Sequence, residues 1–392
     1  MSSVAHKTNI IVAMIEPVGS HGGMDYYDSG LCAGLSANGV TNFWYTCDIS
    51  SQRGERSVCV IGSFKKIWGK DPGWKRGLRY IAGLLRTMSD ARNRKANIVH
   101  FHFFHVGVLE AVGVLLARIF GLRVVVTVHD VEAFKPGGKS LVLQRMVYGL
   151  CSRVVVHNQV SQEELVRRCG VKNELVRIVP HGSYLGLIPA AMDSKAARNM
   201  LGLPQDEFII LFFGQIKEVK GLDLLIEAFA LAKERMGPAR LVIAGKVWKD
   251  DFARYQDLIE RCALADAISL HIRYIPDDEI AAYYGAADIV VLPYRKIYQS
   301  GVLLMAMSYG IPVLASDLPG MCEVVADGEN GFLFRTGDSG HLAERLIAVL
   351  EDAQALSRVV ARAQEDMESR FSWDTIGAQL ANVYREALRD AR

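Results

Sequence analysis

The chain has 392 residues, which is too long for one hydrophobic core and fits two domains of roughly 150 to 200 residues each. Half of the residues are hydrophobic and 22% are charged, a balance that excludes collagen-like, coiled-coil and disordered chains. The net charge of +2 excludes a protein that holds nucleic acid by its overall charge.

Cysteine spacing and hydropathy indicate the cellular compartment in which the protein is expected. The seven cysteines form no Cys-x-x-Cys pair, which indicates free thiols in a reducing compartment and neither a disulfide framework nor a zinc site. The apolar run from Ile10 to Ile15 is too short for a signal peptide. The longest apolar stretch, Val106 to Phe120, is interrupted by charges and does not fit a membrane span. We therefore expect a cytoplasmic chain, attached at most to the face of a membrane.

Short apolar strands alternate with helix-length segments along the first half of the chain. The first strand, Asn9–Ile15, ends at Pro17 and a glycine-bearing loop, residues 19–23. Similar runs follow at Ile98–Phe103, Val124–Val128, Val154–Val156 and Val176–Val179. Continuous apolar strands of this kind favour a parallel sheet covered by helices on both faces.

The same alternation restarts after a break at residues 183–194, which resembles an interdomain linker. A strand at Phe208–Phe213 precedes an amphipathic helix, Leu222 to Met236, which stops at Gly237. Further strands are expected at Arg240–Ala244, Ile289–Leu292 and Pro312–Ala315. The sequence thus predicts an α/β protein with two Rossmann-like domains, 1–185 and 195–370, and a final helix, 373–392, that packs back on the first domain.

Ligands of open parallel sheets bind beyond the carboxyl ends of the strands. Two such domains are expected to face one another across a cleft lined by these ends. A nicotinamide-dependent oxidoreductase is disfavoured, because no Gly-x-Gly-x-x-Gly follows a strand.

Two strand-to-helix junctions in the second half carry polar signals. The segment Gly214–Gly221 places Lys217 and Lys220 before a helix, where an ammonium and backbone amides can bind phosphate; a plain surface turn is the alternative. In the second segment, 288–316, a helix begins at Ser300-Gly301 after a polar loop, which predicts a further site for an anion or a hydroxyl. A plain βαβ unit is the alternative there.

Three runs in this half carry a family resemblance when they are taken in order. They are Gly214…Lys220-Gly221-Leu222, then Ala306-Met307-Ser308-Tyr309-Gly310-Ile311-Pro312, then Glu323-Val324-Val325-Ala326-Asp327-Gly328…Asn330-Gly331. Together they resemble glycosyltransferase family 4, the retaining, nucleotide-sugar-dependent transferases of GT-B fold. Pro180-His181-Gly182 and the histidine-rich strand ends of the first half also fit.

The resemblance implies a set of residues that bind the donor. It places Lys220 on the diphosphate, with Gly22 and Gly23 approaching the same diphosphate from the first domain. It places the nucleobase at Arg273, Tyr274 and Ile275, and the donor sugar at Gln299, Ser300, Gly301, Val302 and Leu303.

The sequence departs from the family pattern at three positions. The family has two glutamates here, and this chain has Ile297 and Met305. The arginine that normally follows the glycine is Gln215, so that Lys217 is the candidate substitute. The missing glutamates remove contacts to ribose and sugar hydroxyls and leave the donor's identity open.

Histidines gather at the strand ends of the first half, namely His102, His105, His129, His157 and His181. A single histidine in such a place is more often a hydrogen-bonded structural residue, and no carboxylate set accompanies these to bind a metal. By the resemblance, His129 or His102 would face the donor sugar as the catalytic residue, with His129 favoured.

A basic, aromatic-bearing stretch occupies residues 64–95. Trp74, Leu78, Ile81, Leu85 and Met88 recur at helical spacing beside a cationic face. The stretch is either an ordinary surface helix or a contact with anionic lipid headgroups, worth about 1 kcal/mol per basic residue.

The reading that unites these signals is a retaining, metal-independent hexosyltransferase-type glycosyltransferase. It would move a sugar from a UDP-sugar or GDP-mannose type donor, a co-substrate rather than a cofactor, to a hydroxyl acceptor. A lipid-linked saccharide of polysaccharide or lipopolysaccharide synthesis is the expected acceptor, and neither nucleic acid nor a bound cofactor is expected. The alternative is a non-catalytic nucleotide-sugar-binding partner of a glycan assembly complex.

Overall fold

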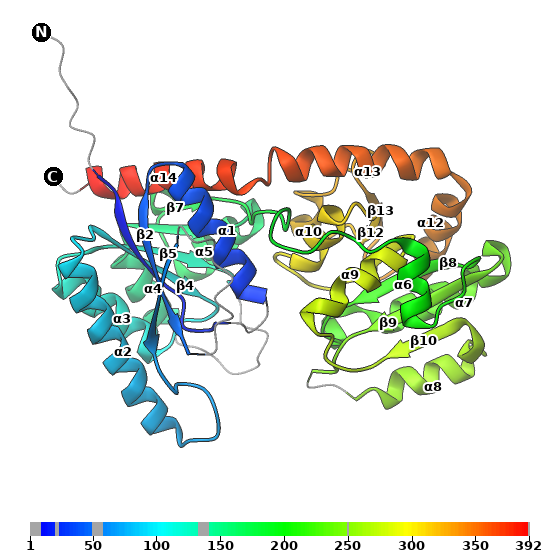
Figure 1. Ribbon diagram of the computed structural model, residues 1–392, viewed down its shortest axis with the longest axis horizontal. Coiled ribbons are helices and arrows are strands. Elements are labelled where there is room, and N and C mark those ends of the chain that lie inside the picture. The colour runs from blue at the N-terminus through cyan, green and yellow to red at the C-terminus, as the bar shows by residue number, and fades with distance from the viewer. Residues whose placement is uncertain (1–8, 20–22, 49–57, 132–140, 249–250, 391–392) are drawn as a thin grey trace, which may run out of the picture. The chain divides into compact units, whose positions relative to one another are not determined.

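The computed structural model describes residues 9–19, 23–48, 58–131, 141–248 and 251–390. The chain divides into two compact units (Figure 1). The first comprises Met1–Gly182 with Phe371–Arg392, and the second comprises Ser183–Arg370. Residues 183–194, which the sequence suggested as a linker, therefore belong to the second unit.

The first unit is built on a seven-stranded parallel sheet with the order β3-β2-β1-β4-β5-β6-β7. Its strands are β1 Ile11–Ile15, β2 Thr41–Cys47, β3 Cys59–Phe64, β4 Ile98–Phe103, β5 Arg123–Val128, β6 Arg153–Val156 and β7 Val176–Ile178. Strands β4 and β6 are buried along their whole length, as expected of apolar strands covered on both faces. The sequence reading missed β2 and β3, whose apolar residues are interrupted by Asn42, Gly62 and Ser63.

Helices cover this sheet in two groups. The helices are α1 Met24–Ala37, α2 Gly73–Asn93, α3 Val108–Ile119, α4 Leu141–Gly149, α5 Gln159–Cys169 and α14 Trp373–Arg389. Helix α14 packs against α1, while α2, α3, α4 and α5 pack side by side in sequence order. The α1–α14 contact depends on glycine, because a Cβ on Gly34 would lie 2.0 Å from the Trp373 carbonyl oxygen.

The second unit is built on a six-stranded parallel sheet with the order β10-β9-β8-β11-β12-β13. Its strands are β8 Phe208–Phe213, β9 Ala239–Ala244, β10 Ile268–His271, β11 Ile289–Leu292, β12 Val313–Ser316 and β13 Phe332–Phe334. Its helices are α6 Ser194–Leu201, α7 Leu222–Met236, α8 Ala253–Arg261, α9 Asp277–Ala286, α10 Gly301–Ser308, α11 Pro319–Cys322, α12 Ser339–Glu351 and α13 Ala353–Glu368. The predicted helix at 222–236 is confirmed as α7.

A hydrophobic core fills the space between the second sheet and helices α7, α8 and α12. It includes Phe212 of β8 and Phe229 of α7, both almost fully buried. This packing makes the sheet a rigid base for the loops at its carboxyl edge, where ligands of such folds bind. None of the described helices is long and apolar enough to span a bilayer.

Candidate functional site

The carboxyl ends of β8, β9 and β10 are joined by backbone contacts. The Gly214 amide donates to the Ala244 carbonyl oxygen at 2.9 Å, and the Gly245 amide donates to that of His271 at 3.1 Å. Gly245 has φ 154°, and a Cβ there would lie 1.8 Å from the Gly214 carbonyl oxygen. Only glycine fits this approach, so this part of the edge presents backbone rather than side chains to a ligand.

Lys220 lies at the N-terminus of α7 in a loop fixed from two sides. The next residue, Gly221, has φ 65°, and a Cβ on it would lie 1.9 Å from the Pro293 carbonyl oxygen. The Arg295 amide donates to the Val219 carbonyl oxygen at 2.9 Å. The Lys220 ammonium lies 3.7 Å from the centre of the Tyr294 ring. The loop after β8 and the loop after β11 therefore hold this cation together.

The neighbouring cation, Arg295, is already paired. Its guanidinium contacts the Asp223 carboxylate in a bidentate manner, at 2.7 and 2.8 Å. No carboxylate among the described residues pairs with Lys220. The positive end of α7 and the ammonium thus form a place for an anion. Lys217 lies on the same loop, with its ammonium 5.9 Å from the centre of the Trp248 ring, and the Gln215 side chain is exposed.

The beginning of α10 adjoins this loop. The Ser300 hydroxyl caps the helix by accepting a hydrogen bond from the Leu303 amide at 3.2 Å. Gly301 packs against Tyr184, whose hydroxyl would lie 2.7 Å from a Cβ at that position. A Val302 methyl group would lie 3.4 Å from a Cβ at Gly214. The structure therefore brings the predicted sugar segment beside the predicted phosphate loop.

Gln299 immediately precedes the cap of α10. Its Oε1 atom is buried and has no hydrogen-bond partner within the described parts of the chain. A buried amide oxygen without a partner is costly, so the position is suited to a hydroxyl or amide supplied by a ligand.

The predicted nucleobase segment lies farther along the same edge. It follows β10, which β9 separates from β8. Ile275 is buried, Tyr274 is 67% exposed, and the Arg273 guanidinium is paired with Glu279. The aromatic ring of Tyr274 is thus open to solvent, whereas Arg273 is already occupied.

Gly23 begins α1 in the first unit with φ 82°. Gly23 itself has no side chain to cap the helix, and the positive end of a helix is a favourable place for an anion. Gly22, the other residue of the predicted glycine pair, lies outside the described residues.

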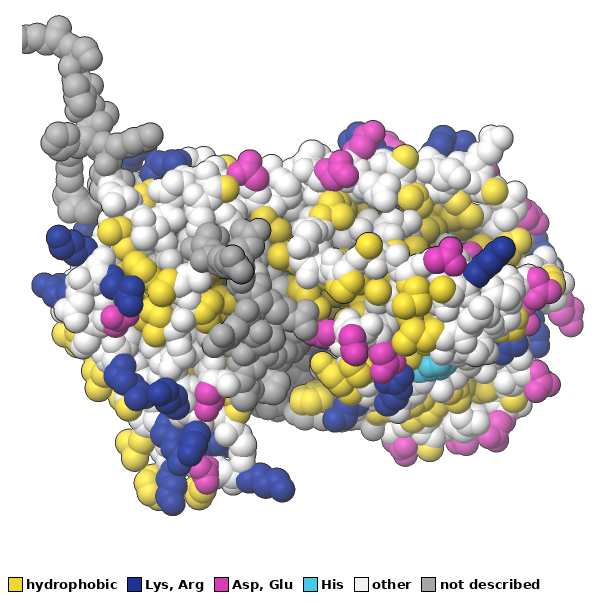
Figure 2. Space-filling model, in the orientation of Figure 1, with side chains coloured by type: hydrophobic (Ala, Val, Ile, Leu, Met, Phe, Trp, Pro, Cys, Tyr) yellow, Lys and Arg dark blue, Asp and Glu magenta, His cyan; other side chains and the backbone are white. Residues whose placement is uncertain are grey.

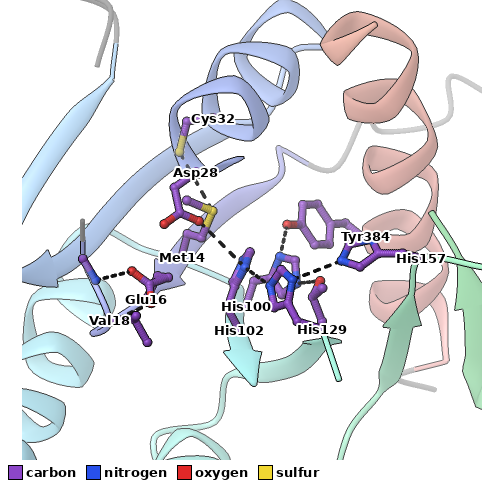
Figure 3. Close-up of polar contacts among 12 residues, drawn as sticks. Met14, Glu16, Val18, Asp28, Cys32, His100, His102, His129, His157 and Tyr384 are labelled. Atoms are coloured by element: carbon purple, nitrogen blue, oxygen red, sulfur yellow. Dashed lines mark hydrogen bonds and ion pairs between the residues drawn. The ribbon is translucent and has the colours of Figure 1, made fainter. Parts of the chain in front are cut away.

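Five histidines from four neighbouring strands and strand ends form one buried cluster, of which Figure 3 labels His100, His102, His129 and His157. They are His100 and His102 of β4, His129 after β5, His157 after β6 and His181 after β7. The rings of His102, His129, His157 and His181 all contact the ring of Tyr27 of α1. Burial lowers the pKa of every one of them, to about 3 for His100 and His157 and about 4 for His181. The cluster is therefore neutral at physiological pH.

Hydrogen bonds join three of these rings into a directed chain. His102 Nδ1 lies 3.2 Å from His129 Nε2, and His129 Nδ1 lies 3.2 Å from His157 Nε2. His157 Nδ1 lies 2.9 Å from the Val179 carbonyl oxygen. That oxygen can only accept, so each ring donates from Nδ1 to the next acceptor. The chain ends at His102 Nε2, a buried nitrogen without a partner within the described residues.

Two buried carboxyl groups lie next to this chain, Glu16 at the end of β1 and Asp28 of α1. The Glu16 carboxylate accepts bonds from the amides of Val18 at 2.7 Å and Gly19 at 2.9 Å. Burial nevertheless raises the pKa of Glu16 to about 7. Burial and the neighbouring Glu16 and Asp25 raise the pKa of Asp28 well above its usual value. Asp28 Oδ1 lies 3.8 Å from His102 Nδ1, so a buried carboxyl group with a raised pKa borders the imidazole chain.

The sequence reading had singled out His102 and His129 but not the groups that surround them. Both ring nitrogens of His129 are bonded to other histidines, and Phe104 stacks on its ring. Glu16 and Asp28 were missed because no motif marks them. A signal was present for Glu16, an acid that directly follows the apolar strand β1. Among the described residues, no group of three or more His, Cys, Asp or Glu is placed to hold a metal ion.

Known proteins match both units of this chain. A family model described as "Glycosyl transferases group 1" matches residues 193–366, and one described as "Glycosyltransferase Family 4" matches residues 21–183. A D-inositol 3-phosphate glycosyltransferase of Thermobispora bispora is 30% identical over 326 residues, covering 79% of this chain and 75% of that protein. One of Xylanimonas cellulosilytica is 28% identical and covers 95% of this chain and 93% of its own.

Solved structures of other proteins match the fold of this chain over nearly its whole length. Anabaena HepE in complex with UDP-glucose matches with a TM-score of 0.75 and 20% identity, over 96% of this chain and all of that one. Sucrose-phosphate synthase from Thermosynechococcus elongatus matches with a TM-score of 0.75 and 21% identity, over 98% of this chain and all of that one. The chain therefore has two parallel-sheet domains of the GT-B type. The matches to both family models show that it is a glycosyltransferase and belongs to glycosyltransferase family 4.

Proposed function

We propose that this enzyme transfers a hexose from a nucleoside diphosphate, of the UDP-sugar or GDP-mannose type, to a hydroxyl acceptor with retention of configuration. The observation that carries the proposal is Lys220, a cation that pairs with no carboxylate of the described residues and is fixed at the N-terminus of α7 by Gly221 and Arg295. A diphosphate is the leaving group that such a site fits.

The reaction breaks the bond between the sugar C1 and the phosphate oxygen. Negative charge then grows on the diphosphate, where Lys220, Lys217 and the N-termini of α7 and α10 would stabilise it. The acceptor oxygen would form its bond to C1 on the same face of the sugar, and its proton would pass to the departing phosphate. With these cations and helix ends in place, the proposed reaction requires no metal ion.

His129 and His102 are proposed to contact the donor sugar. Their ring nitrogens are bonded to each other, so a sugar hydroxyl would replace the His102–His129 bond. A neutral imidazole is suited to this exchange, because it can accept from a hydroxyl without introducing a buried charge.

The remaining donor contacts follow the same edge of the second unit. Gln299 and Ser300 to Leu303 would bind the sugar, and Arg273, Tyr274 and Ile275 the nucleobase. In place of two family glutamates stand Ile297 and Met305, neither of which can accept a hydrogen bond from a hydroxyl group as a carboxylate does. We propose that Gln299 Oε1, buried without a partner in the described structure, takes over one hydroxyl contact.

The proposed acceptor is a lipid-linked saccharide in polysaccharide or lipopolysaccharide synthesis. The enzyme would then act in the cytoplasm and at the inner face of a membrane, which residues 64–95 would contact. The named relatives point to another acceptor, D-inositol 3-phosphate. A non-catalytic nucleotide-sugar-binding partner remains the second candidate, favoured by the apolar Ile297 and Met305.

A transfer assay separates these possibilities. The enzyme is incubated with UDP-glucose or GDP-mannose and with either a polyprenyl-diphosphate saccharide or D-inositol 3-phosphate, and NMR of the product reports the anomeric configuration. We expect an α-linked product on the lipid-linked acceptor. A β-linked product would contradict retention, and product on inositol phosphate alone would contradict the acceptor. Binding without turnover on either acceptor would favour the non-catalytic partner.

A further inference from the structure

Large apolar side chains are exposed on three consecutive helices of the first unit. Among the described residues, most of the exposed ones lie on α2 and its lead-in, α3 and α4. They are Trp68, Trp74, Leu78 and Leu85, then Val108, Leu115 and Ile119, then Leu141, Val142, Met146 and Leu150. We call these eleven side chains the apolar face. A single exposed leucine is ordinary, but a set of this size on adjacent helices indicates a binding surface.

The exposure follows helical spacing. On α3 the exposed residues Val108, Leu115 and Ile119 lie on one stripe, while Gly113, Val114 and Ala117 face the interior. On α2 the stripe of Trp74, Leu78 and Leu85 is exposed, while Leu84 and Met88 are buried. Helices α2 and α3 therefore each have buried residues on the side toward the sheet and large apolar residues that the described part of the unit leaves exposed.

Because α2, α3 and α4 pack side by side, the stripes share one side of the sheet. Ile119 is 69% exposed and Val142 is 67% exposed, which is unusual for β-branched side chains in helices of a folded unit. The sequence reading had expected lipid contact from residues 64–95 alone. The structure adds α3 and α4.

The charge around the apolar face distinguishes between its possible occupants. Residues 64–123 contain twelve Lys and Arg but three Asp and Glu, whereas the whole chain has a net charge of only +2. Two of the acids are paired locally, Asp71 with Arg79 and Asp90 with Arg94. In Figure 2, Lys and Arg side chains alternate with apolar ones at the lower left, over α2. Two copies of this basic surface would repel one another, whereas an anionic bilayer would attract it.

We propose that α2, α3 and α4 together form the membrane-contact surface of this enzyme. The apolar stripes of these helices enter the headgroup layer of an anionic bilayer, and the surrounding Lys and Arg side chains contact the lipid headgroups. The inference extends the peripheral attachment proposed above and names its partner as lipid. It predicts that α3 and α4 are as necessary as α2. An apolar stripe combined with a basic surround is the combination that gives reversible binding to the face of a bilayer without a spanning segment.

Vesicle flotation tests the proposal with the full chain and vesicles that contain no acceptor. Vesicles of phosphatidylethanolamine and phosphatidylglycerol are compared with vesicles of phosphatidylcholine alone. We expect binding to the anionic vesicles that weakens as salt is added. The double variants Leu115→Ser/Ile119→Ser on α3 and Val142→Ser/Met146→Ser on α4 should each bind at least about tenfold more weakly. The matched control Met200→Ser/Leu231→Ser removes two exposed apolar side chains of the second unit and should bind like the wild type.

Three outcomes would overturn the proposal. They are no binding of the wild-type chain to anionic vesicles, binding of the α3 and α4 variants equal to wild type, and a wild-type oligomer, seen by sedimentation, that the α3 variant converts to a monomer. Circular dichroism of each variant excludes misfolding as the cause of lost binding. Transfer to a soluble acceptor analogue is measured alongside, so that failure of membrane binding and failure of the proposed transferase activity are distinguished.

Discussion

His129 Nδ1 lies 3.2 Å from His157 Nε2, and the direction of the proton between them is determined by a third group. His157 Nδ1 faces the Val179 carbonyl oxygen at 2.9 Å, which has no hydrogen to donate. His157 must therefore carry its proton on Nδ1 and accept at Nε2. The same requirement passes through His129 to His102, so one backbone carbonyl sets the tautomer of three buried side chains.

This relationship predicts a spectroscopic pattern. In ¹⁵N-detected imidazole spectra at neutral pH, His102, His129 and His157 should all be neutral and protonated on Nδ1. His341 is an internal control, because its Nδ1 accepts a hydrogen bond from the Arg335 amide at 2.9 Å and its neutral form must therefore carry the proton on Nε2. Protonation of His129 on Nε2 would contradict the chain.

Acid should destabilise the first unit through the same cluster. The histidine pKa values are lowered, to about 3 for His100 and His157, so below the ordinary value of about 6.5 the unfolded chain binds protons that the native chain does not. The raised pKa values of Glu16, about 7, and Asp28 act in the opposite direction. On unfolding in mild acid, the five imidazoles gain protons, whereas the two carboxyl groups lose the protons that they hold in the native state. The unfolded chain should therefore bind about three protons more than the native chain through this cluster.

Urea unfolding at a series of pH values measures this balance. The free energy of unfolding should fall as the pH is lowered from about 6.5 to about 4.5. Glu16→Gln removes one opposing group, so its stability should fall more steeply with acid than that of the wild type. A wild-type stability that is constant across this range, or that rises with acid, would show that the histidines are not buried in their neutral form.

Replacement of Lys220 should abolish most of the affinity for a nucleoside diphosphate. Loss of a charge-assisted hydrogen bond costs about 1.5 to 3 kcal/mol, which corresponds to roughly 10- to 100-fold weaker binding. A thermal-shift panel with UDP, GDP, ADP and NAD on the wild type and Lys220→Ala measures this, since ligand at a hundred times its Kd stabilises by ~2.7 kcal/mol. Lys195→Ala, an exposed lysine of α6, is the matched control. Equal shifts in the wild type and Lys220→Ala would place the diphosphate elsewhere.

Two glycines offer a matched test of the loop that holds Lys220. Gly221 and Gly202 have nearly the same backbone conformation, φ 65° and φ 66°, but a Cβ on Gly221 would meet the Pro293 carbonyl oxygen at 1.9 Å, while a Cβ on Gly202 would meet nothing within 4 Å. Gly202→Ala should cost about 1 kcal/mol from the left-handed backbone. Gly221→Ala should cost about 1 to 3 kcal/mol more and should also weaken diphosphate binding. Equal losses of stability in the two variants would mean that the loops after β8 and β11 are free to separate.

Local sequence patterns were sufficient for much of the fold. The apolar strands at Phe208–Phe213 and Ile289–Leu292 are confirmed as β8 and β11, because a strand buried on both faces has a continuous apolar run. The apolar run of β3 is interrupted by Gly62 and Ser63, and this strand was missed for that reason. Trp74, Leu78, Ile81, Leu85 and Met88 were predicted as one apolar side of a helix. Spacing alone could not tell which of them are exposed, and the structure exposes Trp74, Leu78 and Leu85 but buries Met88.

For the candidate site, the sequence by itself determined which residues stand at strand ends, and with them the family resemblance and the loop that carries Lys220. Only the tertiary structure decided what those residues contact. It joined Lys220 to Tyr294 and Arg295 to Asp223 from segments about 70 residues apart in the chain, and it enclosed His102 beside Asp28. The physical reason is that hydrogen-bond direction, burial and pKa depend on neighbours distant in the chain, which residue order specifies only through folding.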